Sequence, residues 1–118
     1  MTNASRGDIV LVKFVFAADK ATNNAKGVKH RPGLVVSTDR YHRSRHEMIL
    51  VAITSNVGRL LAGDYKIKAW RESGLLHPST VTGIVRTIKQ EMIAGTIGQL
   101  PADELNSVED KLREILAL

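Results

Sequence analysis

Short apolar runs rich in β-branched residues, separated by polar turn-forming segments, occupy most of this chain before residue 100. Runs of this length that are bounded by Gly, Pro, Asn or Asp are typical of β-strands. The expected strands lie at residues 7–16, 33–38, 48–55, 65–70 and 81–90, with a shorter strand or bend between Gly95 and Gly98. Strands this short and this closely spaced favour a small, strongly curved antiparallel sheet or barrel.

One segment, residues 100–118, has the period of an amphipathic helix. Its apolar residues recur every three or four positions, at Leu105, Val108, Leu112, Ile115 and Leu116. Pro101 suits the first helical turn, and Asp103 and Glu104 lie where the helix dipole is positive. The sequence therefore predicts a single mainly β domain, residues 1–118, made of antiparallel strands with a C-terminal α-helix.

Composition narrows the classes of function. The 118 residues include no cysteine, which excludes a disulfide framework, a thiolate metal site and a cysteine nucleophile. The apolar runs are far shorter than the roughly 20 residues that span a bilayer, and the sequence has no Walker loop, GxGxxG, HExxH or nucleophile elbow. His42 and His46 have helical metal-ligand spacing, but the neighbouring arginines disfavour a bound cation. We therefore expect a globular, cytoplasmic protein without membrane contact, metal or cofactor.

The chain is basic, and its positive charge is local. Lys and Arg total 17 against 12 Asp and Glu, for a net charge of +5, and a basic balance favours a polyanionic partner. Residues 39–47, "DRYHRSRHE", carry three arginines and are expected to form an exposed loop with solvated histidines. Residues 17–30 are small, polar and lysine-rich, and we expect a second long loop there, of a length that is often functional.

Arg31 stands at the entrance to an apolar strand, in "KHRPGLVVS". A guanidinium stays charged and is costly to bury without a partner. Either a carboxylate such as Asp8 pairs with it, or an anionic ligand does. If the second and third strands pair, Thr54 at the end of "VAIT" opens onto the same rim as Arg31. A guanidinium and a hydroxyl at one rim could together hold a phosphate.

These motifs, taken in order, resemble the MazF/PemK/Kid toxins of type II toxin–antitoxin modules. The similar segments are "RGDIVLVKF", "KHRPGLVVS", "VAITSN", "SGLLHPSTV", "RTI" and "IGQLPADELNSVEDKLREILAL". The resemblance implies an SH3-like barrel of the CcdB/PemK type with a C-terminal helix, forming a homodimer. It also implies a sequence-specific, metal-independent endoribonuclease that cuts single-stranded RNA. The C-terminal segment of a cognate antitoxin would occupy the RNA groove.

The resemblance assigns the catalytic roles to Arg31 and Thr54. In the implied reaction the 2′-hydroxyl of the RNA attacks the adjacent phosphorus and leaves a 2′,3′-cyclic phosphate. Some members also use an arginine and an aspartate where this chain has Val81 and Gly83, and their loop histidine falls near Ala25. The proton-transfer group is therefore open, and the two candidates are His30 and His77.

Other residues are candidates for RNA binding through their polar or cationic side chains. They are Asn23, Asn24, Lys26 and Lys29 in the first long loop, Ser55, Asn56 and Arg59 after the third strand, and Arg86 on the fifth. Two alternatives stay open at this point. One is a non-catalytic, CcdB-like toxin that binds gyrase, although the Arg31–Thr54 pair argues against it. The other is a degenerate member that only binds RNA or its antitoxin.

Overall fold

The computed structural model describes residues 4–16 and 27–118. Strands and helices follow one another in the order β1 (Asp8–Phe16), β2 (Gly27–Val35), α1 (Asp39–Arg45), β3 (Glu47–Thr54), β4 (Tyr65–Lys66), β5 (Thr80–Lys89), the 3₁₀ turn η1 (Gln90–Met92), β6 (Ile93–Gln99) and α2 (Ala102–Leu116). The helix α2 confirms the amphipathic pattern of the C-terminal segment. No helix in the described part of the chain is long and apolar enough to cross a membrane.

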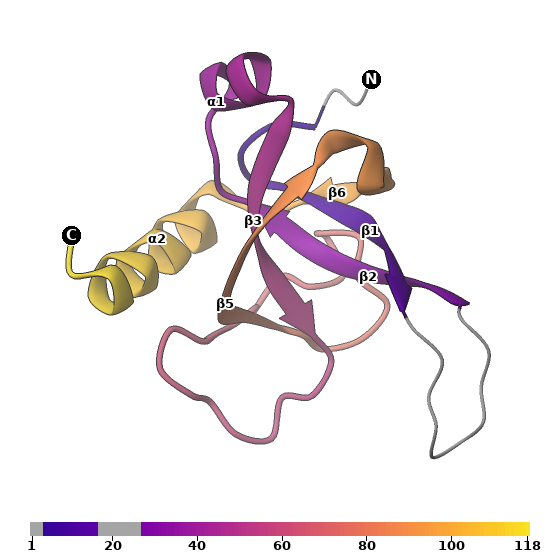
Figure 1. Cartoon of the computed structure of the whole chain (residues 1–118). Coiled ribbons are helices and arrows are strands. Elements are labelled where there is room, and N and C mark those ends of the chain that lie inside the picture. Colours follow the sequence, from indigo (N-terminus) through magenta and orange to yellow (C-terminus); the bar gives the residue numbers. More distant parts are fainter. Residues whose placement is uncertain (1–3, 17–26) are drawn as a thin grey trace.

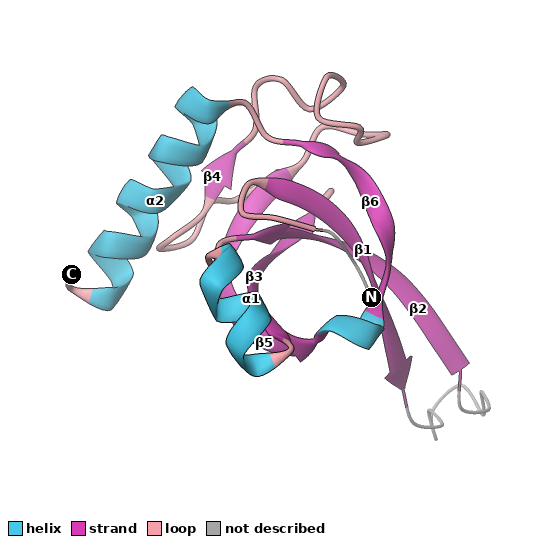
Figure 2. Cartoon of the chain, turned by 90° about the horizontal axis from the view of Figure 1, so that it is seen from above, coloured by secondary structure: helices cyan, strands magenta, loops and turns pink. Residues whose placement is uncertain are grey.

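The strands form one antiparallel sheet in the order β4-β5-β3-β2-β1-β6. Seen from above, the sheet curls strongly around its interior, and α2 lies outside it (Figure 2). Register shifts in the β1–β6 pair mark bulges after Ile9 and Leu11, and bulges increase local twist and bending. The mainly β fold class is thus confirmed. Within residues 4–16 and 27–118 the edge strands β4 and β6 do not pair with each other, so the sheet is open rather than a closed barrel.

Both faces of the central strands are buried, which explains why their sequences are apolar almost throughout. Successive side chains of a strand point to opposite faces. Ile9, Leu34 and Val51 belong to the core cluster that also contains Val108 of α2. Their neighbours Val10, Val35 and Leu50 belong to a second cluster. Figure 1 shows α2 packed at one side of this sheet, away from the β1–β2 ends.

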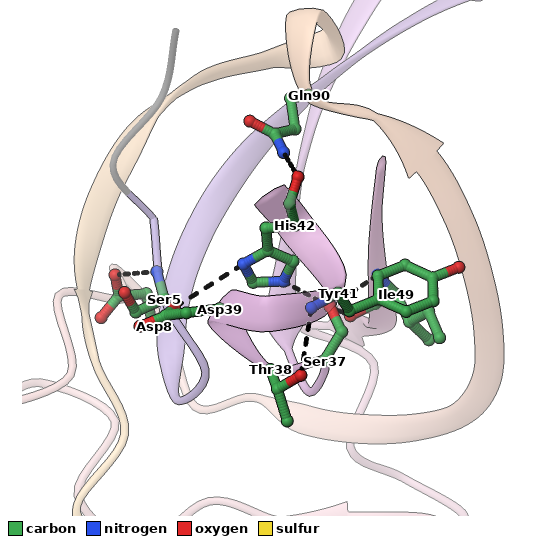
Figure 3. A network of polar contacts seen from close by, with 9 residues as sticks. All are labelled: Ser5, Asp8, Ser37, Thr38, Asp39, Tyr41, His42, Ile49 and Gln90. Atoms are coloured by element: carbon green, nitrogen blue, oxygen red, sulfur yellow. Dashed lines mark hydrogen bonds and ion pairs between the residues drawn. The ribbon is translucent and has the colours of Figure 1, made fainter. Parts of the chain in front are cut away.

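Residues 39–47 differ from the expected exposed loop, because residues 39–45 form the short helix α1. Thr38 caps its start by accepting a hydrogen bond from the Tyr41 N–H at 3.2 Å, which is a standard N-cap arrangement. The expectation of solvated histidines is wrong for His42, which is only 6% exposed. Its Nε2 lies 2.5 Å from the Ser37 hydroxyl, and Ser37 in turn accepts from the Ile49 N–H (Figure 3). This network attaches α1 to β3.

Two strand boundaries also differ from the expected ones. β2 begins at Gly27, inside the segment expected to be a loop, because its residues from Gly27 to Leu34 pair with β1. β4 covers only Tyr65–Lys66 rather than residues 65–70. The chain leaves the sheet after β4 because the backbone N–H groups of Lys68 and Ala69 donate to the Glu104 carboxylate instead of to a strand.

Candidate active site

Arg31 and Thr54 come from neighbouring strands. In the β2–β3 pair Gly33 lies opposite Ala52 and Leu34 opposite Val51. Continued by two residues, this register places Arg31 opposite Thr54, where β3 ends. Both residues line one cavity of about 810 Å³. The strands therefore bring to one cavity the two residues to which the resemblance assigns catalytic roles.

The Arg31 guanidinium is exposed and has no hydrogen bond or ion pair within residues 4–16 and 27–118. Asp8, the acid considered as its partner, is used elsewhere. Its carboxylate accepts from the Ser5 N–H at 2.9 Å and from the Gln99 amide at 3.4 Å. A permanently charged group at the wall of an open cavity can bind an anionic oxygen pair in bidentate fashion.

Thr54 is half-buried, and its hydroxyl is oriented by the chain that follows. Its Oγ1 accepts a hydrogen bond from the Asn56 N–H at 3.1 Å. An oxygen that accepts from the backbone keeps its own proton for donation. Thr54 can therefore donate one hydrogen bond to an anionic oxygen in the cavity.

Further cationic groups line the same cavity. Lys29 lies two residues before Arg31 on β2, and Arg86 lies opposite Leu50 in the β3–β5 register. His77 and Ser55 also line it. No Asp or Glu is among the described residues of the wall, so the local field favours a polyanion. Nowhere in the described ranges do three or more His, Cys, Asp or Glu residues come together as a candidate metal site.

Apolar side chains form the rest of the wall. Leu76 is 85% exposed and Ile84 is 53% exposed, and both line the cavity. Exposed apolar side chains of this size beside cations are suited to a ligand with both anionic and apolar groups. The sequence alone does not predict these two residues as part of the site. For Ile84 a signal existed, because it precedes Arg86 by two positions on one strand and so shares its face.

His77 belongs to the segment of residues 67–79, which connects β4 to β5. The Ile67 N–H donates to the Ser79 carbonyl at 3.0 Å and closes the base of this segment. The Ser79 hydroxyl donates to the His77 carbonyl at 2.8 Å. This segment carries His77, Leu75 and Leu76 to the cavity wall, facing the strands that carry Arg31 and Thr54.

Several candidate residues lie away from the cavity. His30 is exposed, and strand alternation places it on the face opposite to that of Arg31 and Lys29. Asn56 and Arg59 are exposed in the connection after β3 but are not among the residues that line the cavity. The remaining three candidates lie outside the described residues; they are Asn23, Asn24 and Lys26.

Val81 and Gly83, the two positions at which this chain departs from the residues that the resemblance implies, have structural roles here. Val81 is fully buried in the core. Gly83 lies against the connection between β3 and β4, where a Cβ atom on Gly83 would come within 2.7 Å of the Ala62 carbonyl oxygen. The Gly83 N–H also donates to the Asp64 carboxylate at 3.0 Å. A side chain at position 83 would therefore require a local shift of the backbone.

Comparison with solved structures shows the same fold in several toxins. MazF (Form-I) from Deinococcus radiodurans superposes with a TM-score of 0.73 at 21% identity, covering 98% of this chain and 97% of that chain. The toxin MazF-mt6 from Mycobacterium tuberculosis gives a TM-score of 0.73 at 20% identity, covering 94% of this chain and 97% of that chain. A MazE–MazF complex (Form-III) from Deinococcus radiodurans gives 0.74 at 21% identity, covering 98% and 97%. At these identities the likeness shows the fold alone.

A comparison with functionally curated proteins finds no match. A family profile described as "PemK-like, MazF-like toxin of type II toxin-antitoxin system" matches residues 5–116. This match covers nearly the whole chain and includes every residue of the cavity wall. The chain therefore belongs to the PemK-like, MazF-like toxins of type II toxin–antitoxin systems.

Proposed function

We propose that this toxin is a cytoplasmic endoribonuclease that cleaves single-stranded RNA without a metal ion. The observation that carries the proposal is the wall of one cavity of about 810 Å³, which contains Arg31, Thr54 and further cations but no described carboxylate. Such a wall attracts a phosphodiester backbone, since binding of nucleic acid is dominated by its phosphates. The family match and the shared fold support this function.

Cleavage of RNA by its own 2′-hydroxyl needs one group that stabilises negative charge on the phosphate and others that position the phosphate and transfer protons. The 2′-oxygen of the RNA attacks phosphorus and its proton passes to His77. The P–O5′ bond breaks, O5′ takes up a proton from water, and the proton released by His77 neutralises the hydroxide that remains. The Arg31 guanidinium stabilises the additional negative charge on the phosphoryl oxygens, while the Thr54 hydroxyl donates to one of them. The product ends are a 2′,3′-cyclic phosphate and a 5′-hydroxyl.

The same cavity accommodates the inhibitory partner in this proposal. MazF from Deinococcus radiodurans is found in complex with MazE, and a mycobacterial endoribonuclease is found with its cognate antitoxin. We assign the cavity of this chain to the C-terminal segment of its own antitoxin. The exposed side chains of Leu76 and Ile84 would contact apolar residues of that peptide, and the cations its carboxylates. We also propose that the active form of the toxin is a homodimer.

The variant Arg31→Ala tests the catalytic assignment. We expect a loss of cleavage of about 10²–10³-fold, the usual effect of removing one charge-stabilising donor, on a long RNA in EDTA. Because Arg31 is exposed and has no described partner to leave unsatisfied, the melting temperature stays within a few degrees of the original.

Arg40→Ala is the matched control, because Arg40 is an exposed arginine on α1, outside the cavity. It removes the same charge from the molecule and should leave the rate of cleavage unchanged. Cleavage by Arg31→Ala at the original rate would remove the basis of the proposal. Intact RNA together with inhibited DNA supercoiling would identify a gyrase-directed toxin instead.

A further inference from the structure

Glu104 is a buried carboxylate that the proposed reaction does not use. It lies in the first turn of α2 and is 4% exposed. Its oxygens accept three hydrogen bonds, from the Tyr65 hydroxyl at 2.7 Å, from the Lys68 N–H at 2.6 Å and from the Ala69 N–H at 3.1 Å. These donors offset the cost of burying the charge, and the positive end of the α2 dipole adds to this.

The sequence explains why this carboxylate extends away from its own helix. A glutamate three residues after the N-cap commonly bonds back to the backbone N–H of the cap residue. Here the N-cap is Pro101, which has no N–H to donate. Glu104 is therefore available to the segment 67–79, and it accepts hydrogen bonds from the backbone N–H groups of Lys68 and Ala69. Burial of the Tyr65 phenol, together with its hydrogen bond to Glu104, raises the pKa of Tyr65 to about 12.

The two N–H groups bound by Glu104 stand at the start of a compact turn. Within it the Ser73 N–H donates to the Ala69 carbonyl and the Leu75 N–H to the Trp70 carbonyl, each at 3.0 Å. Glu104 thus caps the N-terminal end of this turn, as an acceptor does at the start of a helix.

The far side of the turn is fixed against β6. Gly74 has φ +88° and lies so close to β6 that a Cβ atom there would come within 2.0 Å of the Ile97 carbonyl oxygen. A Cβ atom on Gly98 would in turn be 1.9 Å from the Ser73 carbonyl oxygen. With one end held by Glu104 and the middle held at β6, the turn presents Leu75, Leu76 and His77 to the cavity.

We propose that Glu104 is a positioning residue, which fixes the wall of the cavity that carries Leu76 and His77 through its hydrogen bonds to Lys68 and Ala69. The inference rests on the proposed function, since it assigns that wall to RNA binding. Arg31 and Thr54 are held by the sheet instead. Loss of the carboxylate therefore displaces one wall of the site and leaves the other in place.

Glu104→Gln is the direct test, because it keeps the shape of the side chain and replaces one acceptor oxygen by an N–H₂ donor. At least one of the three donors then faces another donor. We expect kcat/KM for RNA to fall about tenfold, through a higher KM and a lower kcat, because the displaced wall carries both Leu76 and the proton acceptor His77. Trp70, the only tryptophan in the sequence, lies next to Ala69, so its fluorescence emission should shift as the turn moves.

Glu109→Gln is the matched control on the same helix. Glu109 pairs with Arg6 and Arg113 and makes no described contact with the segment 67–79. It should lose some thermal stability and keep both KM and the Trp70 emission. If Glu104→Gln behaves like this control, with a lower melting temperature but unchanged KM and Trp70 emission, then Glu104 has only a structural role. That result would overturn the proposal.

Failure of the proposed function and failure of the positioning role of Glu104 can be told apart. If the unsubstituted toxin cleaves no RNA, the proposed function fails, and an unshifted Trp70 emission in Glu104→Gln then also refutes the positioning role. If Glu104→Gln does not fold, Glu104→Asp replaces it. That variant keeps the charge but withdraws the carboxylate by one methylene, and the same rise in KM and shift in emission are expected.

Discussion

At the scale of single residues, the site depends on one arginine that has no described carboxylate beside it. Its position in "KHRPGLVVS" leads to two alternatives, an internal acid or an anionic ligand. The structure separates them, because the Asp8 carboxylate is bonded to Ser5 and Gln99, and Arg31 faces an open cavity. Sequence reasoning could place Arg31 beside Thr54, because Arg31 directly precedes one apolar run, Thr54 ends another, and the two runs belong to strands that pair.

The two histidine candidates lead to opposite predictions. His77 lines the cavity, whereas His30 lies on the other face of β2. We expect His77→Ala to lower the rate of RNA cleavage by about 10²-fold, at the low end of what a proton-transfer group contributes, and His30→Ala to leave it within twofold. Single-turnover rates measured on one RNA decide the matter. The reverse order of effects would move proton transfer to His30.

At the scale of elements, the strands were predictable and the short helix α1 was not. Apolar runs long enough to cross a curved sheet indicated β1, β3 and β5, although β2 began earlier than its apolar residues. In α1 the arginines obscured the helix, because only His42 is buried among its seven residues. A helix that buries one side chain has no apolar period to detect. The sequence does contain one sign of a helix, the N-cap residue Thr38 before an acidic first turn, but it contains no apolar periodicity there.

β4 shows a second limit of local patterns. Residues 65–70 alternate between apolar and polar side chains, yet the strand stops at Lys66. The reason lies far along the chain, where Glu104 binds the N–H groups of Lys68 and Ala69. A buried acceptor more than 30 residues away outweighs the alternation, and no local window of sequence contains that information.

The buried imidazole of His42 predicts a loss of stability in mild acid. Burial lowers the pKa of His42 below its ordinary value of 6.5, and the nearby Asp39 opposes this only in part. The unfolded chain therefore binds a proton near pH 6.5 that the folded chain excludes until lower pH. From about pH 6.5 downward this difference should reduce the free energy of unfolding by at most about 1.4 kcal/mol per pH unit.

Urea denaturation between pH 7 and pH 5 measures this effect. His42→Gln removes the titrating group, so its stability should fall less steeply with decreasing pH than that of the original protein. His46→Asn is the control, since His46 is exposed at the C-terminal end of the same helix and asparagine tolerates its left-handed backbone, φ 56°. Equal slopes for the original protein and His42→Gln would show that this proton does not contribute.

At the scale of the whole molecule, the curvature of the sheet and the distribution of charge act together. Curling brings β2, β3 and β5 and the segment 67–79 around one cavity, and β2 and β5 carry the cations that line it. The basic composition predicted a polyanionic partner, but only the fold shows that the arginines of α1 lie outside this cavity. The net charge of the chain cannot separate the cations of the cavity from the arginines of α1, because net charge does not depend on which residues lie close together in space.

The chemistry of the cleaved ends tests the central claim most directly. A long single-stranded RNA is incubated with the toxin in EDTA, and the products are analysed by mass spectrometry beside a substrate that carries a 2′-deoxy sugar at the cleaved position. The account predicts 2′,3′-cyclic phosphate and 5′-hydroxyl ends, and no cleavage at the 2′-deoxy position. Cleavage of the 2′-deoxy substrate, or products with 3′-hydroxyl ends, would contradict it.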